Sequence, residues 1–528
     1  MRVAPFPFLV AAWFALVQWR QAGLASTGRL GDLLTSVLGA LAVAALGTLV
    51  GRAVTKDAAA RGLVALTVVA WGALYSSYAA YAVLLGLRLP VADSVLLWTL
   101  LCGLAVFVAS RLTVGEGFVR ALSIGSGLLV LFQVFGAATA MRTVAGETHV
   151  GSGRSAERPD IYLFVLDKYT ASPWLSATYG VDNRAFEDSL RQLGFVLPPA
   201  ARTNYPHTSL VLATLLDGAP VHETVNDSTA RWPAVFARVE QGAMIAALQE
   251  RGYRFAFFPT TFHATSQHPR ADIRLTQDAA RRATWFHSWR ANGPFDALIA
   301  LRCGRHGCQS AAGERVQAFP YPLEAATAIR WKFETVRTLP DSSGPIFSFV
   351  HALLPHEPYQ FSADCEPQEP WWPVNDADAD AAADSTIRAA YAAQVRCANR
   401  LVLETVGELI RRSKIPPVIL IQSDHGHGRM TEDAMSGRTV PLVELTATQL
   451  RERLDVFAAY RVPGHPEVFP DNVTPASVLP RTLNALFNAG LAVPDDRTWW
   501  VDAFRQPLRV TPIPPERLRL SRDAPPSP

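Results

Sequence analysis

The sequence predicts a helical membrane domain followed by an α/β domain with a mainly parallel sheet flanked by helices. Five apolar stretches fill the first 142 of 528 residues, and the mean hydropathy of the whole chain is positive at +0.13. Strand-like runs then alternate with helical patterns, which is typical of a parallel sheet covered on both faces. We expect about five transmembrane helices over residues 1–145, a linker over 146–159, a large α/β domain over 160–505 and a loosely ordered Pro/Arg-rich tail over 506–528.

The apolar stretches cover residues 3–19, 33–49, 62–87, 94–110 and 121–140. Most approach the roughly 20 residues that cross a bilayer. The first is short and contains Pro5 and Pro7, so a cleaved signal peptide is the alternative there. Lys and Arg favour the loops that become cytoplasmic if the amino terminus is inside. An odd number of spans then predicts a multi-pass membrane protein whose large domain, after about residue 145, lies outside the cytoplasm.

The cysteines agree with this location. Four of the five lie in the large domain, as the sequence neighbours Cys303/Cys308 and Cys365/Cys397. An even set in an oxidising compartment indicates two disulfides. Metal binding is the alternative, although the chain has no Cys-x-x-Cys pair. The net charge of +3 says little about partners, and the chain has no basic cluster that would indicate a nucleic-acid partner.

Polar residues follow several predicted strands of the large domain. Strands are expected at residues 160–166, 253–258, 346–350, 418–421 and 456–460, and helices at 184–193, 209–216, 244–251, 323–339, 386–412 and 476–489. Asp167 follows the first strand, His351 and His356 follow the third, and Asp424 and His425 follow the fourth. Ligands of open α/β sheets bind beyond the carboxyl ends of the strands, so we expect one site there.

Thr208 lies where a loop leads into a predicted helix. Most threonines in such a place are N-caps. The same position also offers unpaired amides and the positive end of the helix dipole to an anion. Beside a metal ion, its hydroxyl could attack phosphorus as a nucleophile.

Together these motifs resemble the membrane-anchored sulfatase-like branch of the alkaline phosphatase superfamily, which includes the lipid A phosphoethanolamine transferases and the lipoteichoic acid synthases. The resemblance implies that Thr208 is the nucleophile and that Ser423-Asp424-His425-Gly426 supplies two metal ligands. It further implies one divalent ion, Zn²⁺ or Mn²⁺, bound by a set of four residues: Asp167, Thr208, Asp424 and His425.

Three histidines match substrate-binding positions of the phosphoethanolamine transferases. His351, His356 and Pro358 have the spacing of the family's His-x4-His-x-Pro pattern. His356 would hold the phosphate or protonate the leaving group. The family carries a further histidine after its Ser-Asp-His-Gly motif, for which His427 and His465 are the two candidates in this chain.

Two departures from the sulfatases narrow the expected chemistry. Sulfatases carry Cys-x-Pro-x-Arg at the nucleophile, where this chain has Thr208-Ser209-Leu210-Val211-Leu212. They also place a second acid after the first, where this chain has Lys168. The second departure favours a single metal ion.

The function that the resemblance implies is transfer of a phosphoethanolamine- or glycerophosphate-type group. The donor would be a membrane phospholipid and the acceptor an envelope lipid or glycan, with a phosphothreonine intermediate. A phosphodiesterase or phosphatase that uses water as acceptor is the first alternative. A catalytically inert membrane protein that keeps the fold for binding is the second. The sequence does not indicate the oligomeric state.

Overall fold

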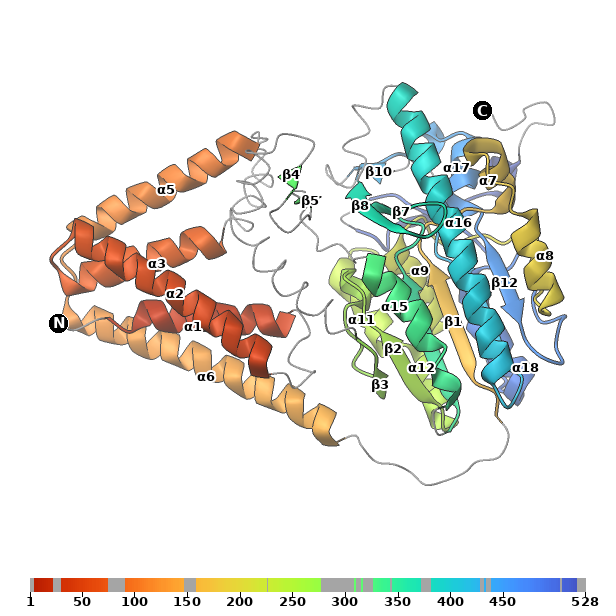
Figure 1. Cartoon of the computed structure of the whole chain (residues 1–528), viewed down its shortest axis with the longest axis horizontal. Helices are drawn as coiled ribbons and strands as arrows, with labels where there is room; N and C mark the ends of the chain where they lie inside the picture. The colour runs from red at the N-terminus through yellow and green to blue at the C-terminus, as the bar shows by residue number, and fades with distance from the viewer. Residues whose placement is uncertain are drawn as a thin grey trace. The chain divides into compact units, whose positions relative to one another are not determined.

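The computed structural model describes residues 4–21, 30–74, 91–146, 158–225, 227–276, 308–309, 315–316, 326–341, 344–371, 381–427, 432–433, 438–503 and 506–519 (Figure 1). The chain divides into two compact units. The first comprises residues 1–151 and 278–323, and the second comprises residues 152–277 and 324–528.

The first unit contains the apolar helices α1 (Phe6–Gln21), α2 (Leu30–Val54), α3 (Ala58–Ala73), α5 (Val91–Arg111) and α6 (Glu116–Gly146). Large apolar side chains such as Leu100 and Phe132 are exposed on α5 and α6, which suits a lipid-facing surface. Two segments are long and apolar enough to cross a bilayer, Val37–Val54 in α2 and Glu116–Phe135 in α6. The five expected spans therefore reduce to two clear candidates within the described part of the chain.

The second unit is built on a six-stranded sheet with the order β12-β9-β1-β6-β2-β3. Its parallel strands are β1 (Ile161–Leu166), β2 (Arg254–Phe258), β3 (Ile273–Arg274), β6 (Ile346–Ala352) and β9 (Val418–Ser423). The edge strand β12 (Ala458–Arg461) runs antiparallel to β9. The expected mainly parallel sheet is confirmed, and β1 is uninterruptedly apolar because it is buried on both faces.

Alternating side chains of β1 divide the core between the two faces of the sheet. Tyr162 and Phe164 pack on the face covered by α7 (Ser172–Tyr179), α8 (Arg184–Gln192), α15 (Ala326–Val336) and α16 (Ala381–Arg412). Ile161 and Leu163 pack on the face covered by α9 (Thr208–Asp217), α11 (Trp232–Gln241), α12 (Ala243–Glu250) and α18 (Pro475–Phe487). Successive strand residues point to opposite faces, so one apolar run anchors both helical layers.

Shorter elements complete the unit. They include α10 (Val221–Val225), α17 (Ala447–Leu454) and the 3₁₀ turns η2 (His263–Thr265), η4 (Leu339–Asp341), η6 (Leu442–Glu444) and η7 (Pro515–Leu518). Two-stranded ladders join β7 (Tyr359–Phe361) to β8 (Pro367–Trp371), β10 (Glu432–Asp433) to β11 (Arg438–Thr439) and β13 (Trp499–Val501) to β14 (Val510–Pro512). In the segment assigned to the first unit, β4 (Cys308–Gln309) pairs with β5 (Arg315–Val316).

One expected disulfide is confirmed and one expectation about the tail is wrong. Cys365 and Cys397 are joined and tie the chain near β7 to α16. The other expected bond involves Cys303, which lies outside the described residues. The tail is not loosely ordered over residues 506–519, because β14 pairs with β13 and the side chains of Ile513 and Leu518 are buried. Ile513 and Leu518 pack in a small core with Trp500. The prediction was wrong because it relied on the proline content of the tail.

Candidate active site

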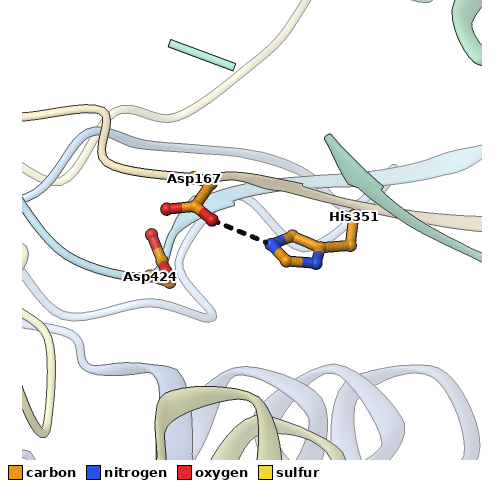
Figure 2. A group of neighbouring side chains, drawn as sticks. All are labelled: Asp167, His351 and Asp424. Atoms are coloured by element: carbon orange, nitrogen blue, oxygen red, sulfur yellow. Dashed lines mark ion pairs between the residues drawn. The ribbon is translucent and has the colours of Figure 1, made fainter. Parts of the chain in front are cut away.

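The register of the sheet brings two acids and a histidine together. Leu166, the last residue of β1, is paired with the last residues of both β6 and β9. Asp167 and Asp424 each follow directly, so both leave the sheet at its carboxyl edge. His351 is the next-to-last residue of β6. One ligand atom from each of these three residues lies within 4.8 Å of the others. Figure 2 shows the three side chains pointing toward one another.

These three side chains form an acidic, almost fully buried cluster. Asp167 is 2% exposed, and His351 and Asp424 are 0% exposed. Asp167 Oδ1, His351 Nε2 and Asp424 Oδ2 lack a hydrogen-bond partner in the part of the chain that the structure describes. Burial and the charge of Asp167 raise the pKa of Asp424, whereas neighbouring histidines lower that of Asp167 although burial opposes this. Two unpaired buried carboxylates are costly without a cation, so the cluster fits a metal ion.

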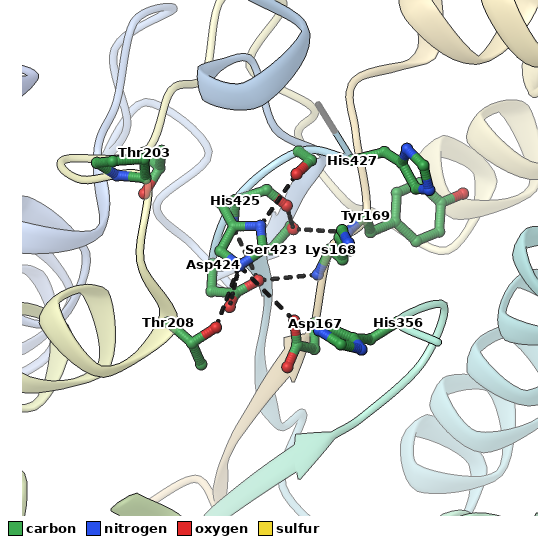
Figure 3. Close-up of polar contacts among 12 residues, drawn as sticks. Asp167, Lys168, Tyr169, Thr203, Thr208, His356, Ser423, Asp424, His425 and His427 are labelled. Carbon is green, nitrogen blue, oxygen red and sulfur yellow. Dashed lines mark hydrogen bonds and ion pairs between the residues drawn. The ribbon is translucent and has the colours of Figure 1, made fainter. Parts of the chain in front are cut away.

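The Thr208 hydroxyl points at the edge of this cluster. Helix α9 begins at Thr208, and its N-cap is His207, whose side chain makes no capping hydrogen bond. The interpretation of Thr208 as an N-cap is therefore wrong. Its Oγ1 lies 3.1 Å from His425 Nε2 instead (Figure 3). The hydroxyl thus stands at the positive end of a helix and beside the acids.

His425 presents a ligand nitrogen to the same place. Its Nδ1 donates a hydrogen bond to the carbonyl oxygen of Gly426, at 3.0 Å. Its Nε2 lies 3.4 Å from Asp424 Oδ2 and 3.9 Å from Asp167 Oδ1. Burial, followed by the nearby positive charge of Arg453, lowers the pKa of the ring. A neutral imidazole with its proton on Nδ1 is the form that coordinates a metal through Nε2.

His351 sits closer to the acids than the sequence indicated, since the motif spacing gave it only a substrate contact. Thr265 Oγ1 lies 2.9 Å from His351 Nδ1 and can accept a hydrogen bond from an Nδ1–H group. Its Nε2 then faces Asp167 Oδ2 at 3.5 Å. Such a hydrogen bond on the far nitrogen is how proteins orient histidine ligands. The pairing of His351 with Val165 in the central strand is the signal that would have revealed this position.

His356 lies beside the cluster in a turn between two cis peptide bonds, Leu354-Pro355 and Glu357-Pro358. Its backbone N–H donates to the carbonyl oxygen of Asp167 at 3.1 Å. Its Nδ1 donates to the carbonyl oxygen of Glu357 at 2.5 Å. The side chain is 30% exposed, so it borders the buried acids and remains open to solvent.

His427 occupies a different environment, a buried cluster of tyrosines. The Tyr179 hydroxyl lies 2.8 Å from its Nδ1, and the Tyr359 hydroxyl lies 3.1 Å from its Nε2. The ring of Tyr391 packs against it, with ring centroids 4.2 Å apart. Both ring nitrogens of His427 are therefore engaged by protein groups, away from Thr208.

Lys168 fills the position of the second sulfatase acid and pairs with a residue that sequence reasoning missed. Its backbone has φ of 68°, and its N–H donates to Asp424 Oδ1 at 2.9 Å. Its Nζ lies 2.7 Å from Glu357 Oε1, and both side chains are only 13% exposed. Burial alone would raise the pKa of Glu357, but Lys168 and then His356 hold it well below the usual range. The Lys168 ammonium group is thus held by its ion pair at the position where sulfatases have a second acid. An acid there would add a metal ligand, whereas the ammonium does not.

Breaking this ion pair from one side should destabilise the domain. In Lys168→Met, the chain length is similar but Glu357 becomes an unpaired buried charge, which costs about 3–5 kcal/mol of unfolding free energy. Because the pKa of Glu357 is lowered in the folded protein, its ionised carboxylate stabilises the wild type at pH values above the usual Glu pKa of about 4.3. This stabilisation is lost as the pH falls. Denaturant unfolding at several pH values measures both effects. The Arg184→Met variant, which removes an exposed pair with Asp182, is the control and should change stability by less than about 1 kcal/mol. Equal losses in the two variants would contradict the prediction.

The sulfatase family model matches residues 177–459, which is more than half of the chain. The chain belongs to the sulfatase family. The match includes Thr208, Asp424 and His425, while Asp167 lies just before it. This membership confirms that the chain belongs to the sulfatase-like branch of the alkaline phosphatase superfamily. The protein is therefore an enzyme of a class that acts on sulfate or phosphate esters. No curated protein sequence matches the chain significantly.

Solved structures similar to this sulfatase-family chain include three enzymes or enzyme domains. The phosphonate monoester hydrolase of Agrobacterium radiobacter is 16% identical, with 65% of this chain and 80% of that chain covered and a TM-score of 0.42. The periplasmic domain of EptC from Escherichia coli is 12% identical, covering 66% and 91%, with a TM-score of 0.39. The lipooligosaccharide phosphoethanolamine transferase A of Neisseria meningitidis is 11% identical, covering 64% and 91%, with a TM-score of 0.39. These likenesses are too distant to transfer a substrate.

Proposed function

We propose that this sulfatase-family protein is a membrane-bound, metal-dependent phosphotransferase. It would move a phosphoethanolamine- or glycerophosphate-type group from a phospholipid to an envelope lipid or glycan. The observation that carries this proposal is the Thr208 hydroxyl at the start of α9, 3.1 Å from His425 Nε2 and beside the buried acids. A threonine hydroxyl in that position suits nucleophilic attack on phosphorus rather than helix capping.

The cluster would hold one Zn²⁺ or Mn²⁺, because carboxylate and imidazole ligands suit both ions. Asp167, Asp424 and His425 are the ligands proposed from the motifs, with the Thr208 oxygen beside them. The position of His351 Nε2 supports adding this residue to the set. When bound, such an ion lowers the pKa of an adjacent hydroxyl and offsets the negative charge of a phosphoryl group.

The protein's own groups divide the chemistry between two half-reactions. Thr208 Oγ1 forms a bond to phosphorus while the bond from phosphorus to the leaving oxygen breaks, and the hydroxyl proton passes to solvent. The partly exposed His356 gives a proton to the leaving oxygen. The positive end of the α9 dipole stabilises the phosphoryl oxygens. In the second half-reaction, an acceptor hydroxyl gives its proton to His356 and forms a bond to phosphorus while the bond from phosphorus to Thr208 Oγ1 breaks, and the Thr208 oxygen takes up a proton from solvent.

The apolar helices of the first unit favour a phospholipid donor, since they would hold the enzyme at the bilayer. We place the second unit on the periplasmic, extracytoplasmic side of an inner membrane crossed several times. The Cys365–Cys397 disulfide supports an oxidising compartment. His356 stays a proposed substrate contact, because it borders the cluster directly. His427 was predicted as a second contact, but its two ring nitrogens already contact the hydroxyls of Tyr179 and Tyr359, so we do not propose it.

Product analysis on the full-length protein tests the proposal. The metal-supplemented protein is reconstituted in vesicles of phosphatidylethanolamine and phosphatidylglycerol with lipid A as acceptor probe. We expect diacylglycerol together with lipid A that carries the phosphoryl-linked group, both detected by mass spectrometry. Diacylglycerol with free phosphoethanolamine or glycerophosphate would indicate hydrolysis instead. No lipid product despite bound metal would overturn the phospholipid donor.

A further inference from the structure

Arg453, near the end of α17, connects the two loops that form the site. Its side chain is buried, with the residue 6% exposed. Nε and Nη2 both donate to the carbonyl oxygen of Pro206, at 3.0 and 2.6 Å. Nη1 donates to the carbonyl oxygens of Gly426 and His427, each at 3.4 Å. One planar guanidinium therefore bridges backbone carbonyls of two segments that are far apart in sequence.

The bridged segments carry the reacting groups. Pro206 precedes Thr208 by two residues, and Gly426 directly follows His425. Arg453 therefore links the two loops whose side chains meet at Thr208 Oγ1 and His425 Nε2, which lie 3.1 Å apart. Arg453 reaches the two loops through hydrogen bonds to backbone carbonyl oxygens.

Backbone contacts hold the end of α17 in place behind the same loops. The Gly426 N–H donates to the carbonyl oxygen of Arg453 at 2.7 Å, and the Thr203 N–H donates to that of Leu454 at 2.9 Å. A Cβ on Gly426 would lie 2.1 Å from the carbonyl oxygen of Glu452, so only glycine allows this approach. The backbone of Arg453 is thus held by hydrogen bonds, and its guanidinium extends from there to the loops of Pro206 and Gly426.

We propose that Arg453 is a positioning residue that sets the distance between the Thr208 hydroxyl and the metal-binding loop. The inference rests on the proposed function, because it assigns Arg453 to the rate of phosphothreonine formation. Lysine cannot replace it, since a single ammonium nitrogen cannot span carbonyls on opposite edges of a guanidinium. A shift of about 1 Å in such a geometry costs roughly 100-fold in rate.

The test compares Arg453→Lys with Arg451→Lys in the full-length protein. Arg451 lies on the same helix and pairs with Asp455 at 2.7 Å, but among the described residues it makes no hydrogen bond or ion pair with either loop. Arg453→Lys should keep its melting temperature within a few degrees. It should lose about 10–100-fold in the rate of phosphothreonine formation and in kcat, with KM little changed, and bind Zn²⁺ about 10-fold more weakly by calorimetric titration. Arg451→Lys should match the wild type in all five measurements.

Each other outcome is also decisive. Wild-type rate and Zn²⁺ affinity in Arg453→Lys would overturn the proposal, as would equal losses in Arg451→Lys. If Arg453→Lys does not fold, Arg453→Ala with added methylguanidine is measured; recovery of the rate supports positioning, and failure to recover it assigns Arg453 to folding alone. If the wild type forms no phosphothreonine, the proposed function fails, while the Zn²⁺ titration still reports whether Arg453 orders the metal-binding loop.

Discussion

Thr208→Ala should fold normally and lose transfer activity by about 10⁴-fold or more, the order seen when a covalent nucleophile is removed. The fold should survive because Thr208 begins α9 without capping it. The substitution removes one side-chain hydrogen bond, which is worth about 1 kcal/mol. Thr208→Ser should retain part of the activity, because the attacking oxygen remains.

The covalent adduct distinguishes Thr208 from its neighbour. Ser209 is buried with 7% exposure, whereas the Thr208 hydroxyl faces His425. After a short incubation with phospholipid, peptide mass spectrometry should find the phosphoryl-linked adduct on Thr208. Ser209→Ala serves as the matched control and should keep its activity. An adduct on Ser209, or wild-type activity in Thr208→Ala, would refute the assignment.

The fold of the second unit was readable because its strands are short apolar runs with polar residues at their ends. Val418–Ser423 is buried at every position, so its composition reflects two-sided burial directly. The tail was misread for the converse reason. Its apolar residues Ile513 and Leu518 are few and separated by prolines, and only their packing against Trp500 makes them part of a core. Composition does not report such a contact between distant segments.

Part of the candidate site could be predicted because its residues stand in recognisable local patterns. Asp424 and His425 end a strand, and Thr208 opens a helix. The sequence placed His351 at the same edge of the sheet as the acids but gave it a substrate contact only, because its position beside Asp167 depends on strand order and register. The contacts of Glu357 with Lys168 and of Arg453 with Pro206 join residues 189 and 247 positions apart. Pairings of this kind follow from the folded backbone alone.

Asp424→Asn should separate metal binding from folding. The side chain keeps its shape, and its oxygen can still accept the N–H groups of Lys168 and His425, at 2.9 and 2.8 Å in the wild type. Losing the charge should weaken Zn²⁺ or Mn²⁺ binding by more than about 100-fold, since even changes that only orient a ligand cost about 10–100-fold. Calorimetric titration of the metal-free protein measures this.

Relative to the wild type, Asp424→Asn should change the unfolding free energy in opposite directions in the metal-free and in the metal-saturated protein. In the metal-free protein, Asp424→Asn removes repulsion with the buried Asp167, so its unfolding free energy should equal or exceed that of the wild type. With saturating metal the wild type should gain about 3–4 kcal/mol at roughly 100–1,000 times the Kd, and the variant should gain much less. Asp182→Asn, which changes an exposed carboxylate, is the control and should bind metal as the wild type does. Unchanged affinity in Asp424→Asn would remove Asp424 from the metal site, because a carboxylate that holds a divalent ion cannot be neutralised without cost.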